Sequence, residues 1–382
     1  MKTSSGRPNY RSHFLIPTPN QRLLLRNKSL KTVTLVLVLS LSAVLLLPPQ
    51  VLAGTFFFST GEPDGRMATL SRPAGAEQIQ TETADDFVVT NCVVINHATF
   101  TGLIPLGTPL ASVSDVEVEL YHVFPKDSVD PPSGNVPSRV NSPGDVEIDS
   151  ATRDGIDGTL SFTVSLLNPN FTAANSVVNG INKFPNQRTQ GEGPVTGQEV
   201  LIDVVFDPPI ALSPDHYFFR PEVLLSSGNF LWLSAPRPIV SPGTPFAPGT
   251  SDLQSWIRND NLAPDWLRIG TDIVGGSPAP MFNAAFSLSG ETDADCDGVA
   301  DSLDLCADTT PGAIVDSDGC SIDQLAPCSG PQSGGSWKNH GQYVSRVAHV
   351  AEAFLAAGLI SEEQKDAIVS NAARSDCGFR TK

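Results

Sequence analysis

The stretch DVEVELYHVF, residues 115–124, alternates apolar and polar side chains over most of its length. Its apolar positions are Val116, Val118 and Leu120, and the polar positions beside them are Glu117, Glu119 and Tyr121. Successive side chains of a β-strand point to opposite sides, so this period of two predicts a strand with one buried face and one face in water.

The same pattern recurs across residues 54–290, where Pro, Gly, Asn and Ser separate short apolar runs. Further runs that predict strands are CVVINHATFTGLI (92–104), GTLSFTVSL (158–166), EVLIDVVF (199–206), HYFFRPEVLL (216–225), NFLWLS (229–234) and FNAAFSLSG (282–290). About nine to eleven such strands, with no helical period between them, predict an antiparallel β-sandwich of the jelly-roll type over residues 54–290.

The N-terminal segment, residues 1–53, has the pattern of a secretory signal. It contains seven Lys and Arg residues and no acid, then the apolar run TVTLVLVLSLSAVLLL at 32–47, and small residues at Val51 and Ala53. We expect a signal peptide cut after Ala53 and a secreted protein. An uncleaved anchor is the alternative, but the run is shorter than the roughly 20 residues that span a bilayer.

Charge limits the partners of the mature chain. Cleavage would leave 17 of the 24 basic residues against 41 acidic ones, a formal charge of −24. Such a surface repels nucleic acid and anionic lipid, so we expect neither as a partner. The C-terminal SDCGFRTK has no apolar tail that would predict a stable membrane anchor. Six cysteines in an exported chain predict disulfides.

Residues 291–328 lose the strand period and become acidic, and DADCDGVADSLDLC (293–306) has the spacing of a cation-binding loop. Loops of the EF-hand kind supply ligands at positions 1, 3, 5, 7, 9 and 12, with Gly at position 6. Counted from the first aspartate, these positions hold Asp293, Asp295, Asp297, the carbonyl of Val299, Asp301 and Asp304, with Gly298 at the turn. The alternative, a structureless acidic linker, accounts for neither the spacing nor the glycine.

This stretch, followed by VDSDGCSIDQ (315–324), resembles the thrombospondin type 3 repeat, whose pattern is D-x-D-x-D-G-x-x-D-x-x-D-x-C. The resemblance covers residues 293–323 and implies calcium as the ion, with Asp316 and Asp318 beginning a second repeat. Cys296 departs from the pattern. The family's cysteines link successive turns, which implies a Cys306–Cys320 bridge worth about 3 kcal/mol in the chain-entropy model. We expect Cys328 to pair with Cys377, which leaves Cys92 and Cys296 as the remaining pair.

The C-terminal part, residues 337–382, follows a linker at 329–336 and predicts a helical hairpin. It resembles tails found after such repeats in secreted bacterial proteins. One apolar stripe is Tyr343, Val347, Val350 and Phe354, and a second helix would turn Ile368, Val369 and Ala372 inward. Gly358 is placed to end the first helix, and Ser361 with Gln364 forms a capping box for the second.

No hydrolase, P-loop or dinucleotide motif occurs, so we expect no enzyme. Glu82, Asp85 and Asp86, near His97, are paired carboxylates of the kind that serve glycoside hydrolysis, but we expect them to be exposed acids at a strand start. Trp232, Trp256 and Trp266, with Tyr121 and Tyr217, either pack in the core or stack on a sugar. Asn170 begins a glycosylation sequon, and His340 and His349 are expected at the surface rather than on a metal.

Two functions of different class remain. The first is a secreted, non-catalytic calcium-binding protein whose β-sandwich recognises an extracellular glycan or protein, in surface attachment or matrix. The second is a secreted polysaccharide hydrolase with the acidic repeat as a spacer.

Overall fold

The computed structural model describes residues 54–75, 78–126, 135–181 and 188–379, all within one compact unit, Leu52–Lys382. The signal peptide expected at residues 1–53, with its cut after Ala53, lies outside the described residues. The boundaries predicted at residues 290, 328 and 336 fall inside this unit and stay predictions. None of the helices in the described ranges has the length and apolar character needed to cross a membrane.

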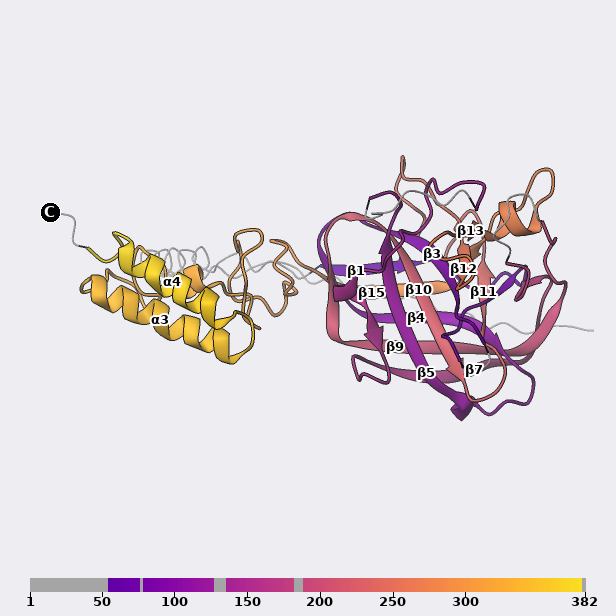
Figure 1. The fold of residues 1–382 in the computed structure, drawn as a ribbon, viewed down its shortest axis with the longest axis horizontal. Helices are drawn as coiled ribbons and strands as arrows, with labels where there is room; N and C mark the ends of the chain where they lie inside the picture. Colours follow the sequence, from indigo (N-terminus) through magenta and orange to yellow (C-terminus); the bar gives the residue numbers. More distant parts are fainter. Residues whose placement is uncertain (1–53, 76–77, 127–134, 182–187, 380–382) are drawn as a thin grey trace, which may run out of the picture. The chain divides into compact units, whose positions relative to one another are not determined.

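Strands dominate the fold and form two sheets (Figure 1). The nine-stranded sheet contains β1 (Thr55–Ser59), β2 (Ala68–Leu70), β4 (Val93–Ile104), β7 (Leu160–Ala173), β8 (Ser176–Val177), β9 (Val195–Leu212), β11 (Leu231–Ala235), β14 (Asn283–Ala284) and β15 (Phe286–Thr292). The six-stranded sheet contains β3 (Thr81–Val89), β5 (Val113–His122), β6 (Arg153–Asp154), β10 (Asp215–Leu225), β12 (Trp256–Asn259) and β13 (Leu267–Arg268). Among the strand pairs of the described residues, that of β2 with β8 is parallel and the others are antiparallel.

The predicted mainly β, antiparallel fold class is confirmed, although the strands outnumber the prediction. The additional ones are only two or three residues long, such as β6, β8 and β14, and so carry no period that a sequence could show. Within the described residues the chain also forms the 3-10 helices η2 (Leu110–Ser112) and η3 (Asp149–Ala151) and the short π-helix η4 (Ile269–Val274).

One hydrophobic core joins the two sheets. Val116, Val118 and Leu120 of β5 are buried in it, as their alternation predicts. Phe219 of β10 stacks on Phe286 of β15 with ring centroids 5.1 Å apart, which places an aromatic contact between the two sheets.

The other face of β5 was predicted to lie in water, and this prediction is wrong. Glu119 and Tyr121 are 8% and 1% exposed, and Glu117 is half-buried. Distant segments cover this face, because Tyr121 packs with Trp256 of β12 and Trp266 in a second apolar cluster. Alternation reports which side chains share a face, and it does not report what packs on that face.

The helical tail agrees closely with the prediction. Its helices are α3 (His340–Ala356) and α4 (Glu362–Arg374), which lie side by side (Figure 1). The single helical turn α2 (Ile322–Leu325) precedes the predicted tail, in the acidic segment. The whole stripe from Tyr343 to Phe354 is buried. Gly358 has φ 74° just beyond the end of α3, and Ser361 forms the capping box with Gln364.

All six cysteines lie within the described residues and form three disulfides. The pairs are Cys92–Cys296, Cys306–Cys320 and Cys328–Cys377, with Cα atoms 5.4, 4.9 and 4.9 Å apart. The expected pairing is therefore confirmed. These bonds fit an oxidising, extracellular environment.

Candidate metal centre and buried ionic cluster

The acidic loop begins where β15 ends and is held to the start of β4. The amide of Asp293 donates to the carbonyl of Cys92 at 3.1 Å, and the Cys92–Cys296 disulfide fixes the loop three residues later. Gly298 has φ 95°, the left-handed conformation that a sharp turn requires at this position. The loop is thus anchored at both sides of its first two aspartates.

Asp293, Asp295 and Asp297 bring their carboxylate oxygens together, and one oxygen from each lies within 4.8 Å of the others. Asp293 is buried and accepts hydrogen bonds from the amides of Asp297 and Gly298 at 3.2 and 2.9 Å. Asp297 Oδ1 accepts from the amide of Val299 at 2.9 Å. Its other oxygen, Oδ2, is buried with no hydrogen-bond partner among the described residues. Buried polar atoms almost always have a partner, so this oxygen calls for one.

A glycine of the second acidic turn, Gly319, lies against both Asp304 and Asp297. A Cβ on Gly319, which has φ 75°, would collide with Asp304 Oδ1 and lie 3.2 Å from Asp297 Oδ2. The two turns are also joined by a hydrogen bond of 2.8 Å from the amide of Leu305 to the carbonyl of Asp318. Asp304 and Asp297 therefore face a position where only glycine leaves room.

Three predicted aspartates, Asp301, Asp316 and Asp318, lie outside this group. Both carboxylate oxygens of Asp301 accept hydrogen bonds, from the amide of Ala294 at 2.7 Å and from the hydroxyl of Thr292. Asp316 Oδ1 accepts from the amides of Asp318 and Cys320 at 3.1 and 3.0 Å, so it shapes its own turn. Asp318 is exposed. None of these three joins the cluster of Asp293, Asp295 and Asp297.

Burial and mutual repulsion act together on these acids. Burial, and then the charges of neighbouring aspartates, raise the pKa values of Asp293, Asp297 and Asp304 above their ordinary range. The ionised cluster is therefore unfavourable by itself, and a cation would relieve the repulsion. Several carboxylates on a short loop with a glycine turn suit a hard cation that takes oxygen ligands.

The acids considered for hydrolysis are not at the surface. Asp85 and Asp86 of β3 are each 1% exposed, and Glu82 is 4% exposed. Asp85 accepts from the amide of Ala284 at 2.8 Å, and Asp86 lies 2.6 Å from His216 Nε2. The prediction of exposed acids at a strand start is thus wrong, because Leu253, Ser255 and Ala284 hydrogen-bond to these carboxylates and cover them.

His97, which was predicted to lie near these acids, is instead on the nine-stranded sheet. Its Nε2 is 2.9 Å from Asp203 of the same sheet.

The tryptophans are core residues. Trp232, Trp256 and Trp266 are at most 1% exposed, and Tyr121 and Tyr217 are also buried. The packing alternative is therefore confirmed for these rings, and none of them can stack on a sugar.

Asn170 of β7 is exposed. On the tail, His340 is half-buried with Nδ1 2.7 Å from the carbonyl of Cys377, whereas His349 is exposed.

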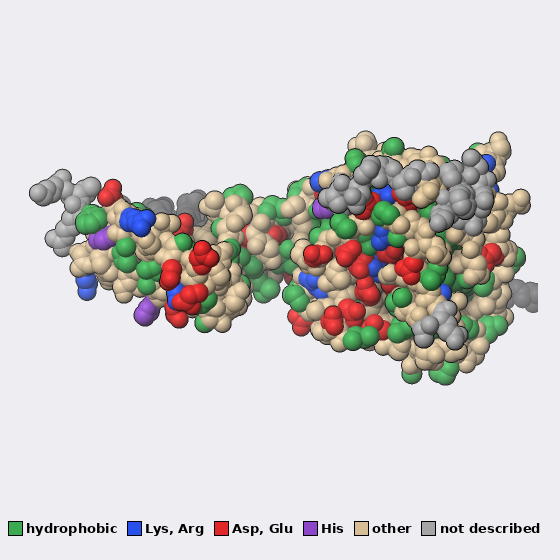
Figure 2. Space-filling view, viewed as in Figure 1, with side chains coloured by type: hydrophobic (Ala, Val, Ile, Leu, Met, Phe, Trp, Pro, Cys, Tyr) green, Lys and Arg blue, Asp and Glu red, His purple; other side chains and the backbone are tan. Residues whose placement is uncertain are grey.

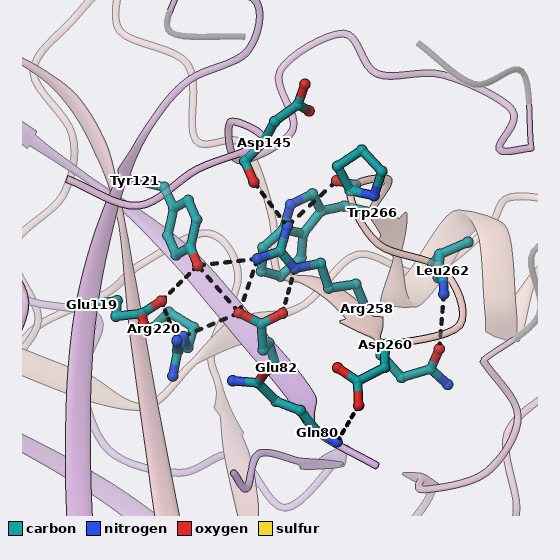
Figure 3. A network of polar contacts seen from close by, with 12 residues as sticks. Gln80, Glu82, Glu119, Tyr121, Asp145, Arg220, Arg258, Asp260, Leu262 and Trp266 are labelled. Atoms are coloured by element: carbon teal, nitrogen blue, oxygen red, sulfur yellow. Dashed lines mark hydrogen bonds and ion pairs between the residues drawn. The ribbon is translucent and has the colours of Figure 1, made fainter. Parts of the chain in front are cut away.

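The covered face of the six-stranded sheet holds an ionic cluster that sequence reasoning missed. Figure 3 shows the carboxylate of Glu82 between Arg220 of β10 and Arg258 of β12. Arg220 Nε lies 3.3 Å from Glu82 Oε1, and Arg258 Nη2 lies 3.1 Å from the same oxygen. The Tyr121 hydroxyl is 2.6 Å from Glu119 Oε2. Arg220 lies in the predicted strand HYFFRPEVLL, but no local signal marks its position as buried.

Acids outnumber arginines in this cluster. Glu82, Glu117, Glu119 and Glu222 all lie within 3.4 Å of Arg220. Burial and the hydrogen bond with Glu119 raise the pKa of Glu117 to about 8. Burial also raises the pKa of Glu222 to about 7, against the opposing charge of Arg220. Burial acts the same way on Glu119, but the charge of Arg220 together with hydrogen bonds from Glu117, Tyr121 and Arg220 outweighs it and lowers the pKa of that group.

These pKa shifts predict that the stability of the predicted β-sandwich, residues 54–290, here called the β domain, falls as pH rises. The folded chain keeps protons on Glu117 and Glu222 that an unfolded chain, with pKa values of 4.5, has released. Their contribution is complete below about pH 4.5 and is lost as pH rises through about 7 to 8. We expect urea unfolding to give a lower free energy of unfolding at about pH 8.5 than at about pH 6.

The matched variant for this prediction is Glu117→Gln with Glu222→Gln, which carries no titrating group at these positions. Its free energy of unfolding should change less over the same pH range. An equal pH dependence in the variant and the unaltered protein would contradict the assignment.

On the face drawn in Figure 2, Asp and Glu side chains gather over the β domain with Lys and Arg among them.

No protein-family model matches the chain, and no curated protein matches it. The resemblance of residues 293–323 to the thrombospondin type 3 repeat therefore rests on those residues alone and stays a prediction.

Proposed function

We propose that this chain is a secreted, non-catalytic calcium-binding protein. In this proposal residues 1–53 are its signal peptide, and a jelly-roll-like β-sandwich recognises an extracellular glycan or protein in surface attachment or matrix. The thrombospondin type 3-like segment is stiffened by calcium. The observation that carries the proposal is the buried Asp297 Oδ2, which has no partner among the described residues and lies beside two further carboxylates.

Asp293, Asp295 and Asp297 would hold the ion, and Asp304 is the next acid able to reach it. The carbonyl of Val299 is the fifth proposed ligand. Asp301, Asp316 and Asp318 have a weaker claim, because none of them joins the group of carboxylates whose oxygens converge. Calcium suits this set because it accepts a variable number of oxygen ligands in flexible geometry.

Chelation is expected to destabilise the C-terminal region selectively. Extracellular calcium modules bind at about 10⁻⁴ to 10⁻³ M. Free calcium at ten times the dissociation constant would add about 1.4 kcal/mol to the stability of the folded segment. We therefore expect a chelator to lower the melting temperature of the region 291–382 and to leave that of the β domain nearly unchanged, as measured by scanning calorimetry.

Two variants sharpen this test. Asp297→Asn removes one charge at constant size and should weaken calcium binding about tenfold or more in a calorimetric titration. Asp308→Asn changes an exposed acid of the same segment outside the proposed ligand set, and should bind as the unaltered protein does. An unaltered melt with and without chelator would contradict the calcium assignment.

The non-catalytic part of the proposal has a separate test. Asp85 and Asp86 are buried and hydrogen-bonded inside the fold, which is a structural rather than a catalytic environment. Release of reducing sugar from polysaccharide that disappears in the Asp85→Asn, Asp86→Asn double variant, with its fold intact, would contradict it.

A further inference from the structure

We infer that the Cys92–Cys296 disulfide positions the ligands of the candidate metal centre and thereby sets its affinity for calcium. This inference rests on the proposed function, and it names the residue pair that regulates the same site. Cys296 is the fourth residue of the loop that begins at Asp293, and it lies between the expected ligands Asp295 and Asp297. It is also the residue that departs from the repeat pattern, so the pattern assigns it no role.

Cys296 has a left-handed backbone conformation, with φ 62°. This conformation is unfavourable for a residue with a Cβ atom, whereas glycine adopts it freely. Gly298, two residues further on, has φ 95° at the position where the loop pattern requires glycine. The loop thus contains two left-handed residues, and only one of them is a glycine. The intrinsic preference of the backbone therefore does not hold Cys296 in this conformation.

The turn at Cys296 directs the backbone amides that follow it. The amides of Asp297 and Gly298 donate to the two carboxylate oxygens of Asp293, at 3.2 and 2.9 Å. Successive amides around a turn of this kind form a concave site for an anion. With the Asp293 carboxylate held there, one oxygen each of Asp293, Asp295 and Asp297 lie within 4.8 Å of one another. The left-handed turn is therefore the feature that makes the three carboxylates converge.

The disulfide is the cross-link that holds this turn. The Cα atom of Cys296 is 5.4 Å from that of Cys92, which is 5% exposed and directly precedes β4. The start of the loop is tied to β4 by the sheet, because Thr292 pairs with Val93. The disulfide adds a second tie inside the loop, at the left-handed residue itself. The Cys296 side chain is exposed, so its burial contributes little to holding it.

Breaking the disulfide should let Cys296 leave the left-handed conformation, so that the carboxylates no longer converge before the ion arrives. Calcium binding would then have to offset the cost of closing the loop, and the affinity would fall, because preorganisation lowers that cost. Disulfides persist in oxidising compartments. The site would therefore reach its full affinity only where Cys92 and Cys296 are joined.

The test compares variants that all lack this disulfide and differ only at position 296. Each carries Cys92→Ala together with Cys296→Gly, Cys296→Asn or Cys296→Ser, and calorimetric titration of the purified protein measures its calcium affinity. We expect the serine variant to bind calcium about tenfold more weakly than the unaltered protein, the size of the usual left-handed penalty. Glycine should restore most of the affinity and asparagine part of it, because these residues adopt positive φ most readily.

The control is Cys328→Ser with Cys377→Ser, which removes the disulfide of the helical tail and should leave the calcium affinity unchanged. Equal affinity of the serine variant and the unaltered protein would overturn the inference, and so would a glycine variant that binds as weakly as the serine variant. If fluorescence of the buried tryptophans shows that the serine variant does not fold, glycine binding no more tightly than asparagine would overturn it instead. Absence of calcium binding by the unaltered protein is a separate result, which would contradict the proposed function and this inference with it.

Discussion

Replacing Arg220 with Ala is expected to lower the free energy of unfolding of the β domain by about 3–5 kcal/mol. Arg220 is 1% exposed and is the central cation of the ionic cluster. Its Nη1 lies 2.9 Å from Glu222 Oε2, its Nε lies 3.3 Å from Glu82, and its Nη2 contacts Glu119. Removing it leaves buried carboxylates with only Arg258 beside Glu82, and uncompensated buried charge is strongly destabilising.

Urea unfolding followed by tryptophan fluorescence measures this loss, because Trp232, Trp256 and Trp266 are buried in the β domain. The control is Lys126→Ala, which breaks an ion pair with Asp215 through a lysine whose side chain is 57% exposed. Exposed pairs contribute about 0–1 kcal/mol, so this change should be small. A loss of less than about 1 kcal/mol for Arg220→Ala would show that the cluster relaxes or neutralises without it.

Removing the Cys328–Cys377 disulfide, by Ser at both positions, is expected to destabilise the helical tail by about 4 kcal/mol in the chain-entropy model. The two cysteines are 49 residues apart in the sequence, and the bridge closes the segment that contains α3 and α4. The core beneath these helices is small, with Trp337 and Phe354 among its larger members. Small domains with limited cores commonly depend on such cross-links.

Circular dichroism at the helical band measures this effect as a lower melting temperature of the tail. The matched comparison is the Cys306→Ser, Cys320→Ser variant, which removes a bridge of sequence separation 14 outside α3 and α4. It should leave the helical signal largely intact and weaken calcium binding instead. A tail that melts unchanged without Cys328–Cys377 would mean that packing alone holds the two helices together.

The sequence predicted correctly those features that depend on residues close together in the chain. The apolar stripe of α3, its end at Gly358 and the capping box of α4 each depend on residues within a few positions of one another. The apolar half of the alternation in residues 115–124 likewise predicted the buried face of β5.

The candidate metal centre was predictable only in part, because spacing reports on one loop and not on contacts between loops. The spacing of Asp293, Asp295 and Asp297 around Gly298 follows from one loop, and these carboxylates do converge. The spacing does not show that Asp301 binds the hydroxyl of Thr292, or that Gly319 of a second turn brings Asp304 and Asp297 to one place.

By itself, the sequence determined the mainly β class, the tail helices and the acidic loop, because period, capping and spacing act within one segment. The tertiary structure alone decided that the polar face of β5 is covered and that Arg220 lies among four acids. Apart from the contact of Arg220 with Glu222, those features arise from contacts between residues more than a hundred positions apart, such as Arg258 with Glu82 at a separation of 176. Burial and ion pairing depend on what packs against a side chain, and a strand carries the same alternation whether its polar face meets water or protein.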